Sequence, residues 1–89
     1  MLEESVTIIN TLGLHARAAG KWVETTSRFS SDIIIEKDGR NVDAKSIMAM
    51  MMLAAGKGTD IKIKTNGEDE EQAMKAIITL IENCFGEDE

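Results

Sequence analysis

The only histidine of the 89-residue sequence, His15, occurs in the run Gly13-Leu14-His15-Ala16-Arg17, where an apolar segment gives way to a helical pattern. An imidazole ring provides a nucleophilic nitrogen, and the guanidinium of Arg17 provides a partner for an anion. The first turn of a helix also leaves backbone N–H groups unpaired, and the helix dipole favours negative charge there. A lone histidine more often has a surface or capping role, but this combination favours phosphoryl chemistry at His15.

A second stretch with functional potential begins at Ser46, a good N-cap for a short helix that starts at Ile47. This helix is apolar on nearly every side, and it carries Ile47, Met48, Met51 and Met52. A short surface helix can bury only one stripe, so some of these side chains should stay exposed, as in an adaptable partner-binding surface. The alternative is a deeply buried helix, which is less favoured because a small domain has little interior to surround it.

The elements that must position these residues follow from the apolar periodicity. We expect strands at residues 5–10, 32–37, 40–42 and 60–65, and helices at 16–29, 47–53 and 68–85. Asp38-Gly39 predicts a two-residue hairpin turn, Trp22 should lie in the core, and Cys84 should be a buried structural thiol on the last helix. The resulting βαββαβα order predicts an α+β fold, a four-stranded antiparallel sheet covered on one face by three helices, in one domain of residues 1–89.

Composition excludes several classes of function. The net charge of −6 argues against a nucleic-acid-binding protein, and a single cysteine excludes an internal disulfide. Clustered histidine and cysteine ligands for a metal are absent from the sequence, and nothing in it calls for a cofactor. The start of the sequence lacks a signal-peptide pattern, and no apolar run reaches membrane-spanning length. We therefore expect a cytoplasmic protein without membrane insertion.

The run Gly13-Leu14-His15-Ala16-Arg17, together with Lys45-Ser46-Ile47-Met48 and the βαββαβα order, closely resembles the HPr family, the histidine-containing phosphocarriers of the bacterial phosphotransferase system. The resemblance implies an open-faced β-sandwich in which Enzyme I, charged by phosphoenolpyruvate, phosphorylates His15 on Nδ1. A IIA domain then takes the phosphoryl group. It also implies that Arg17 pairs with the phosphate, and that Ser46 is the target of a regulatory HPr kinase in many members.

The resemblance implies a stoichiometric carrier of phosphate and not an enzyme, and we expect it to be a monomer. Apolar residues around the site would position the partners, and the candidates are Leu14, Gly20, Ile47, Met48 and Met51. One departure from the family is Ala18, where proline is usual, and alanine is compatible with a helix start without enforcing it.

Two alternatives to the sugar-uptake carrier remain. One is a purely regulatory paralogue that acts through Ser46 by protein binding, although such proteins usually lack the histidine. The other is a nitrogen-branch relative that carries phosphate for regulation without sugar uptake.

Overall fold

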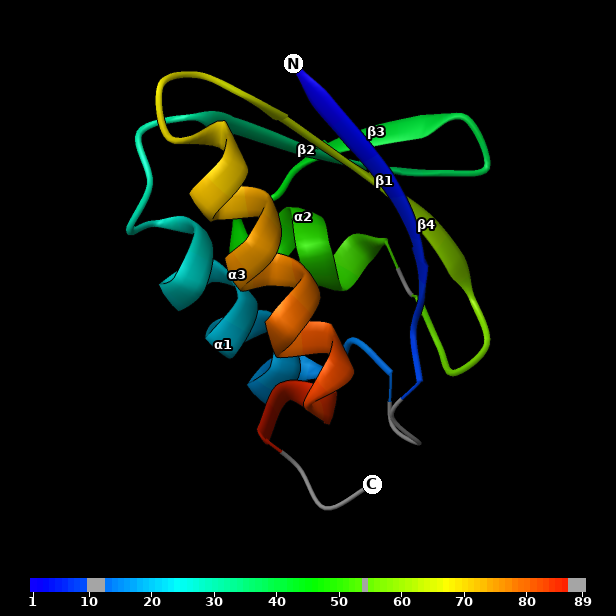
Figure 1. The fold of residues 1–89 in the computed structure, drawn as a ribbon. Coiled ribbons are helices and arrows are strands. Elements are labelled where there is room, and N and C mark those ends of the chain that lie inside the picture. Colours follow the sequence, from blue (N-terminus) through cyan, green and yellow to red (C-terminus); the bar gives the residue numbers. More distant parts are fainter. Residues whose placement is uncertain (10–12, 54, 87–89) are drawn as a thin grey trace.

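The computed structural model describes residues 1–9, 13–53 and 55–86, and its elements follow the predicted order (Figure 1). They are β1 (Leu2–Thr7), α1 (Ala16–Thr26), β2 (Asp32–Lys37), β3 (Arg40–Asp43), α2 (Ile47–Met52), β4 (Asp60–Asn66), α3 (Glu70–Glu82) and a terminal 3-10 turn, η1 (Cys84–Gly86). The βαββαβα prediction is confirmed, with η1 added at its end. None of the described helices combines the length and the apolar character that a membrane span requires.

The four strands form one antiparallel sheet in the order β1-β4-β2-β3, and the three helices cover one of its faces (Figure 1). Alternate residues of the two central strands are buried beneath the helices, among them Ile33, Ile35, Ile61 and Ile63. The opposite face remains open. This arrangement confirms the predicted α+β, open-faced sandwich, and it follows from the period-2 pattern of β4, in which isoleucines alternate with lysines.

The core is centred on Trp22, which is fully buried and lies 6.0 Å from the ring of Phe85, measured between centroids. The prediction that Trp22 is a core residue is therefore confirmed. Asp38 and Gly39 both have positive φ values, 52° and 81°, which confirms the tight hairpin turn between β2 and β3.

The loops that precede β2 and α3 are joined through Asp69. Its carboxylate accepts hydrogen bonds from the backbone N–H groups of Ser30 and Ser31, both at 2.9 Å, and from the Ser31 hydroxyl. Gly67 lies so close to Ser31 that a Cβ at position 67 would be 2.7 Å from the Ser31 Cα. These contacts hold the start of α3 against the end of the loop after α1.

Some element boundaries differ from the predictions. β1 begins at Leu2 because its pairing with β4 starts at Leu2 and Thr65, whereas the prediction began at Ser5 and ended at Asn10, which lies outside the described residues. The prediction of a buried thiol at Cys84 on the last helix was wrong. α3 ends at Glu82, and Cys84 is half-buried in a left-handed turn, φ 52°. The ammonium of Lys21 donates to the Phe85 carbonyl at 2.6 Å, which holds this turn against α1.

Candidate functional site

His15 is the N-cap residue of α1, in an extended backbone conformation with φ −83° and ψ 179°. Its Nδ1 accepts a hydrogen bond from the Arg17 backbone N–H at 3.2 Å, and its carbonyl accepts from the Ala19 N–H at 2.8 Å. The Arg17 N–H thus points at the in-plane lone pair of Nδ1, and His15 is half-buried. A group bound to this atom would meet the positive end of α1.

Arg17 lies in the first turn of α1 with an exposed side chain that makes no ion pair within the described part of the chain. Its guanidinium is therefore available to an anion near His15. The helix begins at Ala16 with Ala18 fully buried at its third position, so α1 starts at the histidine without a proline. A negatively charged group at Nδ1 would meet the first-turn N–H groups of α1, with the exposed Arg17 two residues further along the chain.

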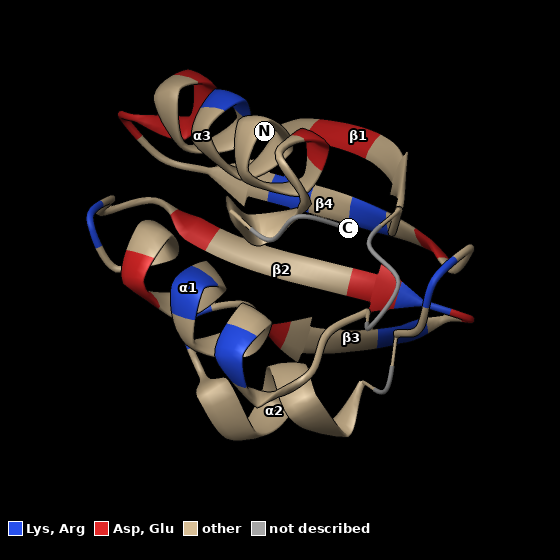
Figure 2. Ribbon diagram, turned by 90° about the horizontal axis from the view of Figure 1, so that it is seen from below, with Lys and Arg blue, Asp and Glu red and all other residues tan. Residues whose placement is uncertain are grey.

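Ser46 caps α2, as predicted: its Oγ accepts the Ala49 N–H at 3.2 Å. The side chains of α2 are strongly divided, since Met50 is fully buried whereas Ile47, Met48, Met51 and Met52 are 46%, 69%, 42% and 61% exposed. We call these four residues the α2 patch. Figure 2 shows that α2 carries no charged residue and lies beside the basic segments of α1. The expectation of exposed apolar residues on this helix is confirmed, and the deeply buried alternative is excluded.

The remaining candidates for partner binding, Leu14 and Gly20, have different environments. Leu14 is only 6% exposed and belongs to the core, so we correct its proposed place at the docking surface. Its apolar side chain packs in the hydrophobic core, and its N–H donates to the Ala55 carbonyl at 2.8 Å. Gly20 is half-buried on α1, and a Cβ built there meets no atom within 4 Å. Gly20 thus borders open space.

Sequence reasoning missed the contact between residues 13–15, which we call the His15 loop, and residues 55–56. Gly13 has a positive φ of 64°, and a Cβ at this position would lie 2.6 Å from the Ala55 carbonyl oxygen. The glycine itself was a visible signal for an unusual backbone conformation. No local pattern, however, indicates which segment packs against it.

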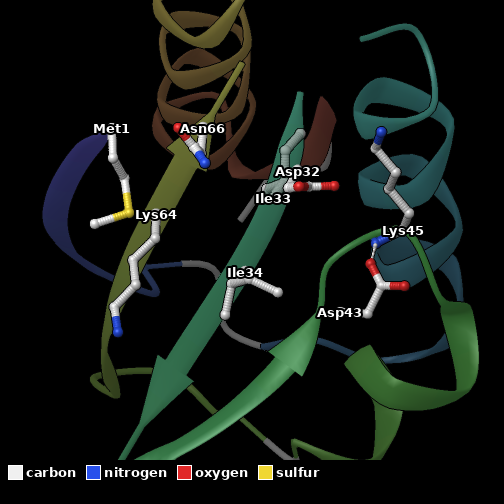
Figure 3. Close-up of a pocket in the computed structure, with 8 residues that line it drawn as sticks. All are labelled: Met1, Asp32, Ile33, Ile34, Asp43, Lys45, Lys64 and Asn66. Carbon is white, nitrogen blue, oxygen red and sulfur yellow. Dashed lines mark hydrogen bonds between the residues drawn. The ribbon is translucent and has the colours of Figure 1, made fainter. Parts of the chain in front are cut away.

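A separate hollow of about 490 Å³ lies at the open face of the sheet, around Ile34 (Figure 3). Its lysines are already engaged: Lys64 contacts Glu36 at 2.7 Å, and Lys45 donates to the Phe29 carbonyl at 2.8 Å. The hydrogen bond between Lys64 and Glu36 raises the pKa of the lysine and lowers the pKa of the glutamate. None of the predicted site residues lines this hollow, and no group of described His, Cys, Asp and Glu side chains could hold a metal ion.

Comparison with known proteins agrees with this geometry. A family model described as the PTS HPr component phosphorylation site matches residues 2–83. The phosphocarrier protein HPr of Neisseria meningitidis serogroup A is 52% identical over 89 residues, which is 100% of both chains. The HPr-like protein Crh of Halalkalibacterium halodurans is 49% identical over 82 residues, 92% of this chain and 98% of the relative. The crystal structure of HPr-C-His from Thermoanaerobacter tengcongensis superposes with a TM-score of 0.96 at 48% identity, covering 100% of both chains.

Proposed function

The chain belongs to the HPr family of phosphocarriers of the phosphotransferase system, and on this premise we propose that His15 is its phosphoryl-carrying residue. The observation that supports this most strongly is the position of His15 as the N-cap of α1, with Nδ1 3.2 Å from the Arg17 backbone nitrogen. The lone pair of Nδ1 is first released from its hydrogen bond with the Arg17 N–H and then attacks the phosphorus atom of phospho-Enzyme I, which leaves this N–H free to donate to a phosphoryl oxygen. The bond from phosphorus to the donor nitrogen breaks as the new N–P bond forms.

The carrier needs to hold the phosphoryl group and also to release it. The exposed guanidinium of Arg17 and the first-turn N–H groups of α1 stabilise the phosphoryl oxygens. Because the site is shallow and lies at the surface, an acceptor histidine on a IIA domain can approach in line with the N–P bond. The chain acts as a stoichiometric intermediate, and most of the catalytic groups belong to its partners.

The direct test is incubation with phosphoenolpyruvate and Enzyme I, followed by measurement of the protein mass. We expect a gain of one phosphoryl group that is lost in acid and stable in base. His15→Ala should abolish the gain, whereas Gln72→Ala, a change on the exposed side of α3, should leave it intact. A phosphoryl label that persists in His15→Ala would refute the assignment.

Docking of Enzyme I and of IIA domains is the second part of the proposal, and we assign it to the α2 patch and the open surface at Gly20. The α2 patch carries four exposed apolar side chains without a charge, and methionine adapts to differently shaped partners. Arg17, an exposed residue in the first turn of the neighbouring helix α1, adds positive charge near this surface, which suits an acidic partner surface.

Regulation at Ser46 is the third part of the proposal. A phosphate on Ser46 would lie at the first turn of α2, where free N–H groups stabilise it locally. It would add a charge of about −1.5 to −2 beside Ile47 and Met48, inside the surface that a partner must desolvate. A serine kinase would therefore inhibit transfer without unfolding the domain. The simpler explanation is that Ser46 is an N-cap and nothing more.

A second candidate function is a regulatory or nitrogen-branch member that signals by protein binding and does not serve sugar uptake. The regulatory form is favoured by the similarity to Crh of Bacillus subtilis, which is 38% identical and is described as a catabolite repression protein. The presence of His15 favours a phosphate carrier over a purely regulatory protein. Phosphorylated chain should be offered to IIA domains of the sugar and nitrogen branches in parallel. Transfer to the nitrogen-branch domain alone would favour the second candidate, and transfer to a sugar-branch domain would favour the first.

We further propose that the chain works as a monomer in the cytoplasm, as a single domain over residues 1–89. A carrier that presents His15 to successive partners needs its α1 and α2 surfaces uncovered. Size-exclusion chromatography with light scattering tests this, and the mass of a dimer at working concentrations would contradict it.

A further inference from the structure

The described residues on either side of positions 10–12 are hydrogen-bonded to one segment, Ala55–Thr59. Before the loop, the Ile8 N–H donates to the Thr59 carbonyl at 2.9 Å, and the Gly58 N–H donates to the Ile8 carbonyl at 2.7 Å. Immediately before His15, the Leu14 N–H donates to the Ala55 carbonyl at 2.8 Å. We call residues 55–59 the holding segment. Three backbone hydrogen bonds thus connect the holding segment to Ile8 at the end of β1 and to Leu14 in the His15 loop.

Gly13 makes the closest approach to this segment. Its φ is +64°, and a Cβ at position 13 would lie 2.6 Å from the Ala55 carbonyl oxygen and 2.7 Å from the Gly56 Cα. Both of these atoms belong to the backbone, so no change of side-chain rotamer can make room for a Cβ. Any residue other than glycine must displace either the holding segment or the His15 loop.

The consequence for His15 follows from its distance along the chain. His15 is two residues after Gly13 and immediately follows Leu14, whose side chain is buried. A displacement at Gly13 is therefore passed to the N-cap, where it changes the position of Nδ1 relative to the first-turn N–H groups. Misplacing a reacting atom by about 1 Å can slow a transfer by about 100-fold.

We propose that Gly13 is a positioning residue for phosphoryl transfer, which acts by packing against the backbone of Ala55 and Gly56. This inference rests on the proposed function of His15. It adds the residue that fixes the position of the His15 ring. The holding segment follows α2, which carries the α2 patch, so the docking helix and the histidine loop share one stretch of backbone.

Two other glycines provide matched controls. Gly67 is equally crowded, since its Cβ would lie 2.7 Å from the Ser31 Cα, but it lies at the start of α3 beside the loop before β2. Gly39 has a φ of +81° with no atom within 4 Å of its Cβ, so it tests backbone strain without crowding. If crowding or strain acted only through stability, these variants would behave as Gly13→Ala does.

The experiment measures kcat and KM for transfer from phospho-Enzyme I, normalised to the folded fraction reported by the fluorescence of Trp22, the only tryptophan. We expect Gly13→Ala to lower kcat at least tenfold with KM within twofold of wild type. Gly67→Ala and Gly39→Ala should keep the wild-type kcat per folded molecule. Nuclear magnetic resonance should show shifts of the His15 ring and the Arg17 amide in Gly13→Ala without Enzyme I present.

A second, milder variant covers the case in which Gly13→Ala does not fold. Replacing Leu14 by its α-hydroxy analogue turns the peptide bond between residues 13 and 14 into an ester. This removes the N–H that donates to Ala55 without adding a Cβ at position 13, and it also weakens the Gly13 carbonyl as an acceptor. This variant should lower kcat severalfold with KM unchanged. A wild-type kcat per folded molecule in either folded variant, or an equal loss in Gly67→Ala, would overturn the positioning role. Failure of the wild-type chain to accept phosphate would instead refute the proposed function itself.

Discussion

The division of α2 into exposed and buried methionines allows a paired test of the docking surface. Met48 is 69% exposed and Met50, two residues later, is fully buried. Truncation of a buried methionine to alanine removes its transfer free energy and leaves a cavity, which costs about 2–5 kcal/mol. Met50→Ala should therefore destabilise the domain, and each kcal/mol lost should lower Tm by about 4–8 °C. Partner binding by the remaining folded molecules should change little.

Met48→Glu should have the opposite effects: little change in stability and a large loss of partner binding. A glutamate there adds a negative charge in the first turn of α2, where the helix dipole tolerates it, so the urea midpoint should remain close to that of wild type. In a complex the carboxylate must be desolvated against the partner. We expect KM for Enzyme I and for the IIA domain to rise at least tenfold, about 1.4 kcal/mol of lost binding.

The assay combines urea unfolding, followed by Trp22 fluorescence, with transfer kinetics at varied concentrations of the protein. Met48→Gln, which is polar but uncharged, separates loss of apolar contact from the added charge. Gln72→Glu places the same charge on the exposed side of α3 and should change neither KM nor stability. Unchanged KM values for both partners in Met48→Glu would refute the docking proposal. A stable Met50→Ala would refute the reasoning from burial.

Three further predictions concern single residues. Arg17→Ala should leave thermal unfolding almost unchanged, because the side chain is exposed. It should slow phosphoryl transfer about 100-fold, the usual effect of removing a donor to developing charge, and a normal transfer rate would contradict the role of Arg17. Ser46→Asp should give a folded protein whose transfer from Enzyme I is slowed severalfold, less at high salt, whereas unchanged transfer at low salt would leave Ser46 as a simple cap. Hydrogen bonds from the Ser31 hydroxyl and the Ser30 N–H lower the pKa of Asp69 from 3.8 to about 2. The contribution of the Asp69 carboxylate to the free energy of unfolding is therefore present above pH 3.8 and is lost as the pH falls towards 2. Urea midpoints measured across this range should show a smaller slope in Asp69→Asn, and an equal slope would contradict the assignment.

Several features were predictable from the sequence because they depend on neighbouring residues. A serine before an apolar run predicts an N-cap, and Ser46 caps α2. Asp38-Gly39 predicts a turn with two positive φ values, and both are present. The sequence also shows His15 at a helix start with Arg17 in the first turn. Each of these inferences needs only the local backbone preference of a few consecutive residues. The strand β4, inferred from alternating isoleucine and lysine, is also determined by a few consecutive residues.

Other features were decided only by tertiary structure, because their partners are far apart in the chain. Leu14 was predicted to lie at the docking surface, but its side chain is buried in the core and its N–H pairs with the Ala55 carbonyl. Cys84 lies beyond the end of α3, in a turn whose Phe85 carbonyl accepts a hydrogen bond from Lys21, 64 residues earlier. Asp69 is the N-cap residue of α3 but makes no side-chain capping bond, because its carboxylate accepts the N–H of Ser31, 38 residues earlier. Local propensity cannot indicate which distant backbone group will compete for a side chain. Only the folded arrangement, which brings those groups within hydrogen-bonding distance, determines how the His15 loop is held.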